Sequence, residues 1–402
     1  MHEVFIYDGI RTAFGRHGGA LAKIRTDELL SLTIQEIMNR NTFDGSLVED
    51  VVAGATNQAG EDSRNVARTA ALLAGLPATV AGITVNRLCA SSAAAVLDAA
   101  RAVRCGEGQL MIACGVESMS RSPWVISKSD SAFGRSQEMY DSTIGWRFPN
   151  QKFIKQYGDD SMAQTADNIA ADLGINREDS DVFAYGSQQK YAAALQQGFY
   201  DEEIMAVQVP PARRKDPPVM FDRDEHPRPE TTLEKLSALR PLYDGGVVTA
   251  GNASGINDGA GALLLGNKEI GEKLGLKRRV KIISGAVAGV EPRVMGLGPV
   301  PASQKALQRA GLELKDLDIL EINEAFATQV LGVLKQLQIP FTDERVNPNG
   351  GAIAIGHPLG ASGARLILTA MRQLERSEGR YALVSLCIGI GQGIALILER
   401  IK

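Results

Sequence analysis

The sequence predicts an α/β protein made of two similar halves, with a long insertion in the first half. Short apolar runs alternate with segments whose apolar residues have helical spacing, which is the pattern of an α/β fold. The order strand, loop, helix, strand occurs before residue 118 and again after residue 278. Residues 119–248 instead mix turn formers, aromatic residues and charges, which is typical of an insertion that shapes a substrate pocket.

We therefore divide the chain into three parts. The first half comprises residues 1–118 and 249–277, a loop domain covers residues 119–248, and the second half comprises residues 278–402. A chain of 402 residues is long enough to form more than one hydrophobic core. The net charge of -4 and the lack of a basic stripe argue against a nucleic-acid partner. The short basic run Arg213-Arg214-Lys215 is explained equally by a solvated loop or by contact with an anionic substrate.

The first half begins with a strand-like pattern and continues with alternating elements. Apolar residues at helical spacing, opened by Thr26-Asp27-Glu28, predict an amphipathic helix. Continuous apolar runs predict buried strands. In order, we expect a helix at 26–40, a strand at 49–54, a helix at 63–75, a buried strand at 80–85, a helix over 93–100 and a strand at 109–116.

The second half repeats this order. In the loop domain we expect helices at 162–173 and 180–197, and the α/β pattern resumes at 248–255. The segment 317–324 matches the strand at 49–54, and a Gly-rich loop at 347–351 leads to a helix at 362–375. Residues 381–389 match the strand at 109–116. The apolar stretch 381–398 is interrupted by four glycines, so it predicts two buried strands and a tight turn rather than a membrane span.

Cys89 lies between the predicted strand at 80–85 and the following helix. Free N–H groups and the helix dipole at such a junction favour a thiolate, which makes Cys89 a candidate nucleophile. The alternative is a small apolar side chain in the core, the usual role of a buried free cysteine. On this stretch alone the second interpretation is favoured.

Three further residues make the first interpretation stronger. His357 lies among glycines and apolar residues and is the leading candidate for a base that acts on Cys89, with His226 second. Cys387 ends a predicted strand and suits proton transfer to carbon. Asn323 ends another strand and suits water or oxyanion binding. A core histidine and a core cysteine are the alternatives for the first two.

The four cysteines form no CxxC pair and do not resemble a disulfide framework. With four histidines in the chain, no zinc-type cluster is expected. The N-terminus enters a strand-like pattern without the layout of a secretory signal. A reduced, cytoplasmic enzyme without a membrane partner is therefore expected.

Several motifs together resemble the thiolase family over nearly the whole chain, and their order and intervals also match. The closest resemblance is to the 3-oxoadipyl-CoA type, on Asp141 to Phe148 and on the segment after Cys387. The motifs are Asn86-Arg87-Leu88-Cys89, Gly115-Val116-Glu117-Ser118-Met119-Ser120, Asn323-Glu324-Ala325-Phe326, Asn347-Pro348-Asn349-Gly350-Gly351-Ala352, Gly356-His357-Pro358-Leu359-Gly360 and Cys387-Ile388-Gly389.

The resemblance implies a thiolase fold, with the two halves stacked as a five-layered αβαβα core under the loop domain. It implies that Cys89 is the nucleophile, that His357 activates it, and that Asn323 holds a water beside His357. Cys387 would move the proton of acetyl-CoA, and the backbone N–H groups of Cys89 and Gly389 would form an oxyanion hole. The positions that match CoA and pantetheine contacts are Ser254, Arg228, Tyr243, Ala250, Met162, Met295 and Phe326.

Three positions depart from the family pattern. Ala90 and Ser92 stand where glycine or serine, and then glycine, are usual. Ile390 replaces a common glycine, and members of the 3-oxoadipyl-CoA type also carry a branched residue at this position. Ser161 stands where acetoacetyl-specific members have histidine, which argues against a dedicated acetoacetyl-CoA enzyme.

The function implied is cleavage of 3-oxoadipyl-CoA by CoA, with coenzyme A as substrate, no cofactor and no metal. Arg147 is our candidate for the distal carboxylate, because guanidinium binds carboxylate with two parallel hydrogen bonds. A homodimer or homotetramer is implied. The alternatives are a broad-range 3-ketoacyl-CoA thiolase of fatty-acid β-oxidation, an acetyl-CoA acetyltransferase, a cysteine hydrolase and a non-catalytic CoA-binding protein.

Overall fold

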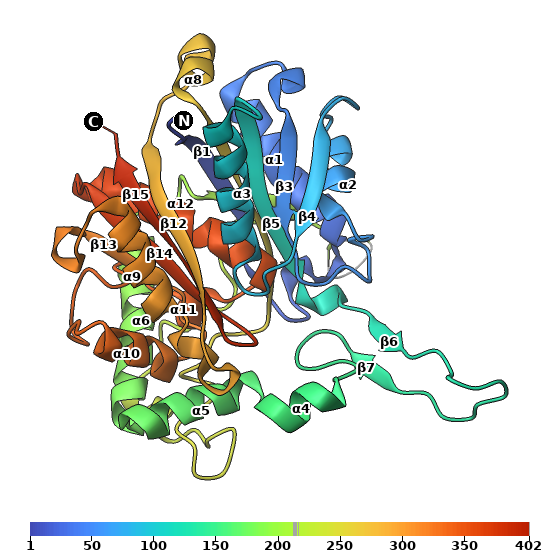
Figure 1. The fold of residues 1–402 in the computed structure, drawn as a ribbon, viewed down its shortest axis with the longest axis vertical. Coiled ribbons are helices and arrows are strands. Elements are labelled where there is room, and N and C mark those ends of the chain that lie inside the picture. The colour runs from blue at the N-terminus through green and yellow to red at the C-terminus, as the bar shows by residue number, and fades with distance from the viewer. Residues whose placement is uncertain (212–214, 216, 402) are drawn as a thin grey trace.

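Two groups of strands, one from each half of the chain, make up the central sheet of the computed structural model, which describes residues 1–211, 215 and 217–401 (Figure 1). Their order is β13-β14-β15-β12-β1-β11-β5-β3-β4. The two groups meet where β1 pairs with β12 through Phe5–Lys281 and Ile6–Val280. The strands are β1 (Phe5–Thr12), β3 (Asp50–Gly54), β4 (Ala81–Val85), β5 (Leu110–Ser118) and β11 (Asn257–Gly266), then β12 (Val280–Gly289), β13 (Ile319–Ile322), β14 (Tyr381–Ile388) and β15 (Gln392–Arg400).

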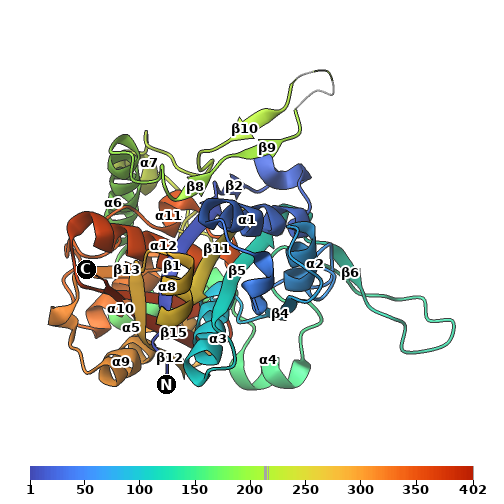
Figure 2. The ribbon, with the colours of Figure 1, turned by 90° about the horizontal axis from the view of Figure 1, so that it is seen from above.

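Helices cover both outer faces and fill the space between the two groups of strands (Figure 2). The inner pair is α3 (Ser91–Cys105) and α12 (Leu359–Ser377), whose apolar residues join one core cluster with strands of both halves. The outer helices are α1 (Thr26–Asn41) and α2 (Val66–Leu73) on the first half, and α9 (Pro299–Ala310) and α10 (Ala327–Gln336) on the second. This arrangement has five layers, and the predicted fold class is confirmed.

The pairing pattern of the first half repeats in the second. β3 pairs with β5 in parallel, and β5 pairs with β11 antiparallel; β13 pairs with β14 in parallel, and β14 pairs with β15 antiparallel. A parallel bridge between Leu320 and Val346 matches the pairing of β3 with β4. By this topology α3 and α12 occupy equivalent places. The predicted duplication is confirmed at the level of topology.

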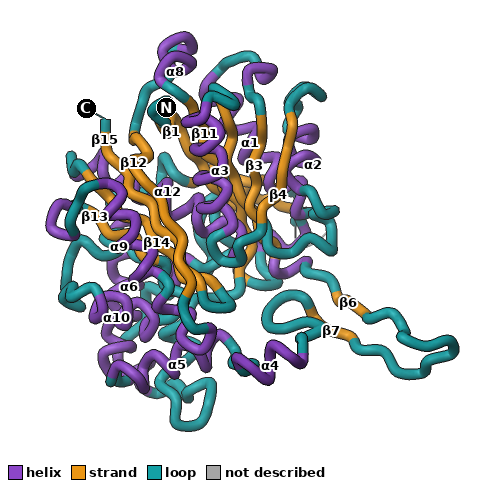
Figure 3. The backbone as a smooth tube through the Cα atoms, viewed as in Figure 1, coloured by secondary structure: helices purple, strands orange, loops and turns teal. Residues whose placement is uncertain are grey.

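Residues 119–248 contain mostly short elements, and the boundaries of a loop domain at these residues stay a prediction. The ribbon of β6 and β7 projects away from the rest of the molecule (Figures 1 and 3). The elements here are β6 (Trp124–Ile126), β7 (Met139–Asp141), α4 (Gln151–Tyr157), α5 (Met162–Leu173), α6 (Arg177–Gln196), β8 (Ile204–Met205), β9 (Val207–Val209), β10 (Val219–Phe221) and α7 (Leu233–Ser237). The remaining elements are β2 (Gly15–Arg16), α8 (Lys268–Leu274) and α11 (Ala352–Ile355).

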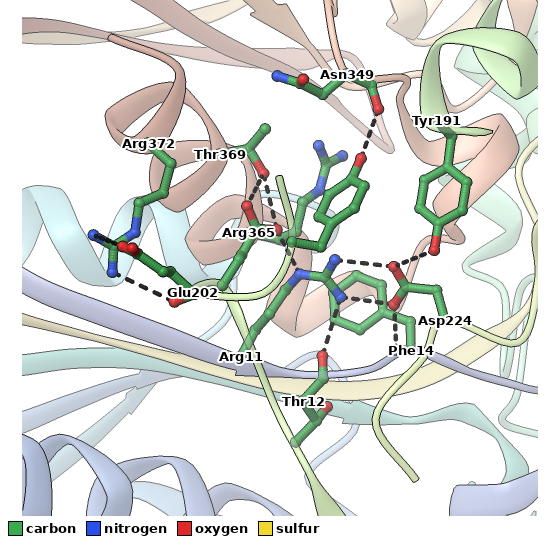
Figure 4. A network of polar contacts seen from close by, with 12 residues as sticks. Arg11, Thr12, Phe14, Tyr191, Glu202, Asp224, Asn349, Arg365, Thr369 and Arg372 are labelled. Atoms are coloured by element: carbon green, nitrogen blue, oxygen red, sulfur yellow. Dashed lines mark hydrogen bonds and ion pairs between the residues drawn. The ribbon is translucent and has the colours of Figure 1, made fainter. Parts of the chain in front are cut away.

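A buried ion network ties this region to the core (Figure 4). Arg11 of β1 is fully buried and donates to Glu203 at 2.6 Å and to both oxygens of Asp224, at 2.7 and 2.9 Å. Glu203 also accepts a hydrogen bond from Thr369 of α12, and Asp224 accepts one from Tyr191 of α6. One guanidinium therefore joins β1, α12 and the segment around residues 191–224.

Three predictions of local structure need correction. The strand at 80–85 is not buried, because β4 is the last strand in the order and leaves Ile83 46% exposed. The helix expected from residue 63 begins at Val66, since Asn65 caps it by accepting from the backbone N–H of Arg68. The segment 248–255 precedes β11 as loop. Arg213 and Arg214 of the basic run lie outside the described residues.

No helix within the described part of the chain is long and apolar enough to cross a membrane.

Candidate active site

Cys89 lies in the loop between β4 and α3, two residues before the first helical residue, Ser91. Leu88 precedes it in the left-handed region, with a φ of 46°. This conformation is unfavourable for a side chain such as leucine. It is held by two hydrogen bonds: the Leu88 N–H donates to Asn86 Oδ1 at 2.9 Å, and Ser91 Oγ donates to the Leu88 carbonyl at 2.6 Å. The local sequence therefore fixes the direction of the Cys89 N–H group.

His357 lies in the matching loop of the second half, two residues before Leu359 of α12. Its backbone N–H donates to Oδ1 of Asn257 at 2.9 Å, and Nδ2 of Asn257 donates to the Gly15 carbonyl at 3.0 Å. Its ring lies between Ser362 Oγ, 2.6 Å from Nδ1, and Asn323 Nδ2, 3.3 Å from Nε2. The first half thus holds the backbone of this histidine, and the second half holds its ring.

The N-termini of α3 and α12 pack directly on each other. The Ala364 N–H of α12 donates to Ser92 Oγ of α3 at 2.9 Å. A Cβ on Gly363 would overlap the backbone nitrogen of Ala93. The Gly360 N–H donates to Glu117 at 2.9 Å, and Glu117 also accepts from the N–H groups of the loop after β3. The two loops that carry Cys89 and His357 are therefore brought to the same end of the two inner helices.

Cys387 and Gly389 complete this group from the end of β14. The Gly389 N–H is near enough to the Cys89 sulfur to act toward a lower pKa of this thiol. Cys387 is buried in a small cluster with Met162, Met295 and Phe326. The turn after Gly389 is strained, because Ile390 has a φ of 66° although it is β-branched. The structure thus places a donor on the candidate nucleophile and a second thiol close by.

The pKa shifts of Cys89 and His357 favour the uncharged form of both side chains at rest. Burial raises the pKa of Cys89 to about 11, although the N–H groups of Gly389 and Cys89 act in the opposite direction. Burial and the nearby guanidinium of Arg365 lower the pKa of His357 to about 3. Burial also raises the pKa of Cys387. Desolvation therefore acts against the thiolate that the helix N-terminus favours, and it is the largest cause of the shift at Cys89.

Of the eight proposed binding residues, four lie at this group and four lie further out. Met162, Met295 and Phe326 pack in one cluster with Cys387, and the Ser254 N–H donates to the Ala325 carbonyl at 3.0 Å. Tyr243, Ala250 and Arg228 are exposed on the adjoining loops. Arg147 donates to the Ser142 carbonyl at 3.4 Å, and Ser142 Oγ accepts from Asn57 Nδ2 at 3.0 Å. Arg147 therefore lies at the edge of the site.

Four side chains of this site were not among the predicted functional residues: Glu117, Asn257, Ser362 and Ser92. Glu117 lies inside the motif at 115–120 and Ser362 lies two residues after the motif at 356–360, but a motif does not say which atom a side chain meets. Asn257 is separated from His357 by 100 residues, so spacing carries no signal for it. Ser92 was noted as a departure from the family, and its hydroxyl proves to join α3 to α12.

Family models match almost the entire chain. The model of the thiolase N-terminal domain matches residues 4–269, and that of the thiolase C-terminal domain matches residues 276–400. The chain belongs to the thiolase family. It is therefore an enzyme of the thiolase class, and the resemblance of its motifs is confirmed.

Relatives of this thiolase match it over the full length. It is 55% identical to the 3-oxoadipyl-CoA/3-oxo-5,6-dehydrosuberyl-CoA thiolase of Escherichia coli K12, over 100% of both chains. It is 54% identical to a beta-ketoadipyl-CoA thiolase of Acinetobacter baylyi and 44% identical to an acetyl-CoA acetyltransferase of Cupriavidus necator, again over 100% of both chains. Among solved structures, the Bacillus anthracis acetyl-CoA acetyltransferase superposes with a TM-score of 0.92 at 37% identity, covering 100% of this chain and 99% of the other.

Within the described residues, no group of three or more histidine, cysteine, aspartate or glutamate side chains is arranged to hold a metal ion.

Proposed function

We propose that the protein cleaves 3-oxoadipyl-CoA with CoA to give succinyl-CoA and acetyl-CoA, with coenzyme A as substrate. This proposal is supported by the proximity of Cys89, Gly389 and Cys387. The chain that carries them is 55% identical to a relative named 3-oxoadipyl-CoA/3-oxo-5,6-dehydrosuberyl-CoA thiolase. These groups supply a nucleophile, an N–H donor for the acyl oxygen and a second thiol for proton transfer.

In the first half-reaction Cys89 gives its proton to Nε2 of His357, and its sulfur forms a bond to C3 of the substrate. The C2–C3 bond then breaks. The acyl group stays on Cys89 as a thioester, and the electron pair stays on C2 of the leaving acetyl-CoA. Cys387 gives C2 a proton. Asn323 supports this step, because its buried Oδ1 has no partner among the described residues and can hold a water beside His357.

In the second half-reaction the CoA thiol attacks the Cys89 thioester. Its proton passes to the Cys387 thiolate, and the departing Cys89 sulfur recovers its proton from His357, so both cysteines return to thiols. The N–H groups of Cys89 and Gly389 stabilise the oxygen that becomes negative when the thioester is attacked. Burial that keeps both thiols neutral at rest suits this exchange, since each is then ready to give a proton.

The substrate is tested with a matched pair, 3-oxoadipyl-CoA and 3-oxohexanoyl-CoA, which share chain length and differ in the distal carboxylate. We expect a higher kcat/KM for 3-oxoadipyl-CoA, and loss of all cleavage in Cys89→Ala. Arg147→Ala should lower kcat/KM for the dicarboxylic substrate alone, while Arg135→Ala, which removes an exposed arginine from the β6–β7 ribbon, should change neither. Equal kcat/KM for the two substrates would instead favour a broad-range 3-ketoacyl-CoA thiolase. A preference for acetoacetyl-CoA would favour an acetyl-CoA acetyltransferase.

Variants of the same protein test the two remaining alternatives, a cysteine hydrolase and a non-catalytic CoA-binding protein. A hydrolase would release the acyl group without CoA and keep its rate in Cys387→Ser, and a binding protein would keep its properties in Cys89→Ala.

We further propose a cytoplasmic homodimer or homotetramer. The exposed edge of β4, with Ile83, supports subunit association, and light scattering of the purified protein measures the oligomer.

A further inference from the structure

The ring of His357 is held between two polar side chains that face its two nitrogen atoms. Ser362 Oγ lies 2.6 Å from Nδ1, and Asn323 Nδ2 lies 3.3 Å from Nε2. His357 is 4% exposed, so bulk water does not compete for either nitrogen. A neutral imidazole carries one N–H group, and its neighbours decide which nitrogen carries it.

Counting hydrogens on Ser362 decides the position of this proton. The hydroxyl group of Ser362 has one hydrogen, and its Oγ lies 2.9 Å from the Pro358 carbonyl oxygen, which can only accept. The hydroxyl therefore donates to Pro358. Its contact with His357 then requires that Nδ1–H donates to Oγ.

The contact on the other side of the ring leads to the same tautomer. Asn323 Nδ2 can only donate, so Nε2 must offer a lone pair to it. We propose that Ser362 is a positioning residue that holds His357 as the Nδ1–H tautomer, so that Nε2 is the nitrogen that accepts the Cys89 proton. This inference rests on the proposed function, and it explains why Nε2 of His357, rather than Nδ1, acts as the base.

The rest of the structure keeps this arrangement rigid. Ser362 is on the first turns of α12, where it is 1% exposed and donates to the carbonyl of the residue four positions earlier. Asn257 fixes the backbone of His357 from the first half. When Nε2 takes the Cys89 proton the ring becomes an imidazolium, and Nδ1–H continues to donate to Ser362. The contact changes only on the other side of the ring, because a protonated Nε2 can no longer accept from Asn323 Nδ2.

Removing the Ser362 hydroxyl has a defined consequence. In Ser362→Ala the Nδ1–H loses its acceptor in a buried place, which favours movement of the ring proton to Nε2. Leaving this buried donor without a partner should lower the population of the Nδ1–H tautomer by about 10- to 100-fold. The kcat for thiolysis should fall by the same factor with little change in KM, because Ser362 contacts the catalytic histidine and not the substrate in this proposal.

The first experiment observes the tautomer directly. The sequence contains four histidines, so a protein with 15N-labelled histidine rings gives few signals, and His357→Gln identifies the signal of interest. At pH 7 we expect the Nδ1 of His357 to be protonated and Nε2 to be unprotonated. A proton on Nε2 in the resting protein overturns the proposal. This measurement needs no substrate and no Ser362 variant.

The second experiment compares three variants by kcat, KM and the rate at which iodoacetamide alkylates Cys89 at pH 7. Ser362→Ala should be slow in both reactions, and Ser362→Thr should recover most of both rates because it keeps the hydroxyl. Ser284→Ala is the matched control: it removes another buried hydroxyl that donates to a backbone carbonyl, that of Ala306 at 2.7 Å, on β12. It should lower stability without changing either rate.

The outcomes separate the two proposals. A folded Ser362→Ala protein with unchanged kcat and alkylation rate overturns the role of Ser362. A protein with the expected tautomer and the expected alkylation rates, but no cleavage of any 3-oxoacyl-CoA, contradicts the proposed function and leaves the role of Ser362 intact. If Ser362→Ala does not fold, the 15N spectrum of the unmodified protein still decides.

Discussion

The resting protein should hold Cys89 as a neutral thiol, and the pH dependence of its alkylation measures this. Its pKa is raised to about 11, mainly by burial, while the pKa of His357 is lowered to about 3. Since the thiol pKa is raised, the thiolate is scarce at neutral pH and becomes more abundant as the pH increases. At pH 7 about one molecule in 10,000 carries the thiolate, and each pH unit below the pKa changes this fraction about tenfold.

The thiolate is the form that reacts with iodoacetamide, so the rate of labelling follows its population. Between pH 7 and pH 9 we expect the labelling rate of Cys89 to rise about 100-fold, without a plateau. The rate is measured by mass spectrometry of the peptide that contains Cys89. Cys105 is exposed and also reacts, so the protein for this assay carries Cys105→Ser, and the buried Cys114 serves as the unlabelled reference.

A labelling rate that is constant between pH 6 and pH 9 would refute this reasoning. It would show that a thiolate and an imidazolium coexist at rest, as they do when a helix N-terminus and a nearby histidine outweigh burial. The same result would shift the role of His357 from accepting the Cys89 proton during the reaction to holding a charge before it.

Three substitutions test other parts of the argument. Arg11→Ala leaves two buried carboxylates without their cation and should lower the free energy of unfolding by about 3–5 kcal/mol, whereas Arg16→Ala removes an exposed pair and should cost less than about 1 kcal/mol, both measured by urea unfolding. Gly363→Ala forces a methyl group between α3 and α12; it should cost about 1–3 kcal/mol and reduce kcat, and an unchanged kcat contradicts the close packing. Leu88→Gly keeps the left-handed conformation without strain and should retain the acylation rate, whereas Leu88→Val should lose it.

Most of the fold was predictable because its signals are local. The helix at 162–173 was predicted with the bounds that α5 has, and the turn between β14 and β15 follows from the glycines after Cys387. The duplication was visible because each half repeats the same order of elements. The strand at 80–85 shows the limit of such signals. A central strand and an edge strand can have the same apolar sequence pattern, so only the strand order shows that β4 lies at the edge of the sheet.

The candidate site was predictable in its residues but not in its electrostatics. Cys89, His357, Asn323 and Cys387 stand in motifs that a sequence displays. The pKa of Cys89 depends on burial by the fold and on groups 28 and 300 positions away: the charge of Glu117 raises it and the N–H of Gly389 lowers it. The helix end next to Cys89 is a local feature that the sequence displays, whereas the burial of its sulfur depends on the whole fold.

The duplicated topology explains why the chemistry needs both halves. Cys89 stands two residues before α3 and His357 stands two residues before α12, so the proposed nucleophile and its proposed base occupy equivalent positions. The loop before each helix is the place where free N–H groups point outward. Because the N-termini of α3 and α12 pack together, the loops before the two helices come into contact. Each loop can then supply a different side chain. One half alone would carry the Cys89 thiol without His357, or His357 and Cys387 without Cys89. The Ser92–Ala364 and Glu117–Gly360 hydrogen bonds, which cross between the halves, therefore bear on catalysis as directly as the residues that react.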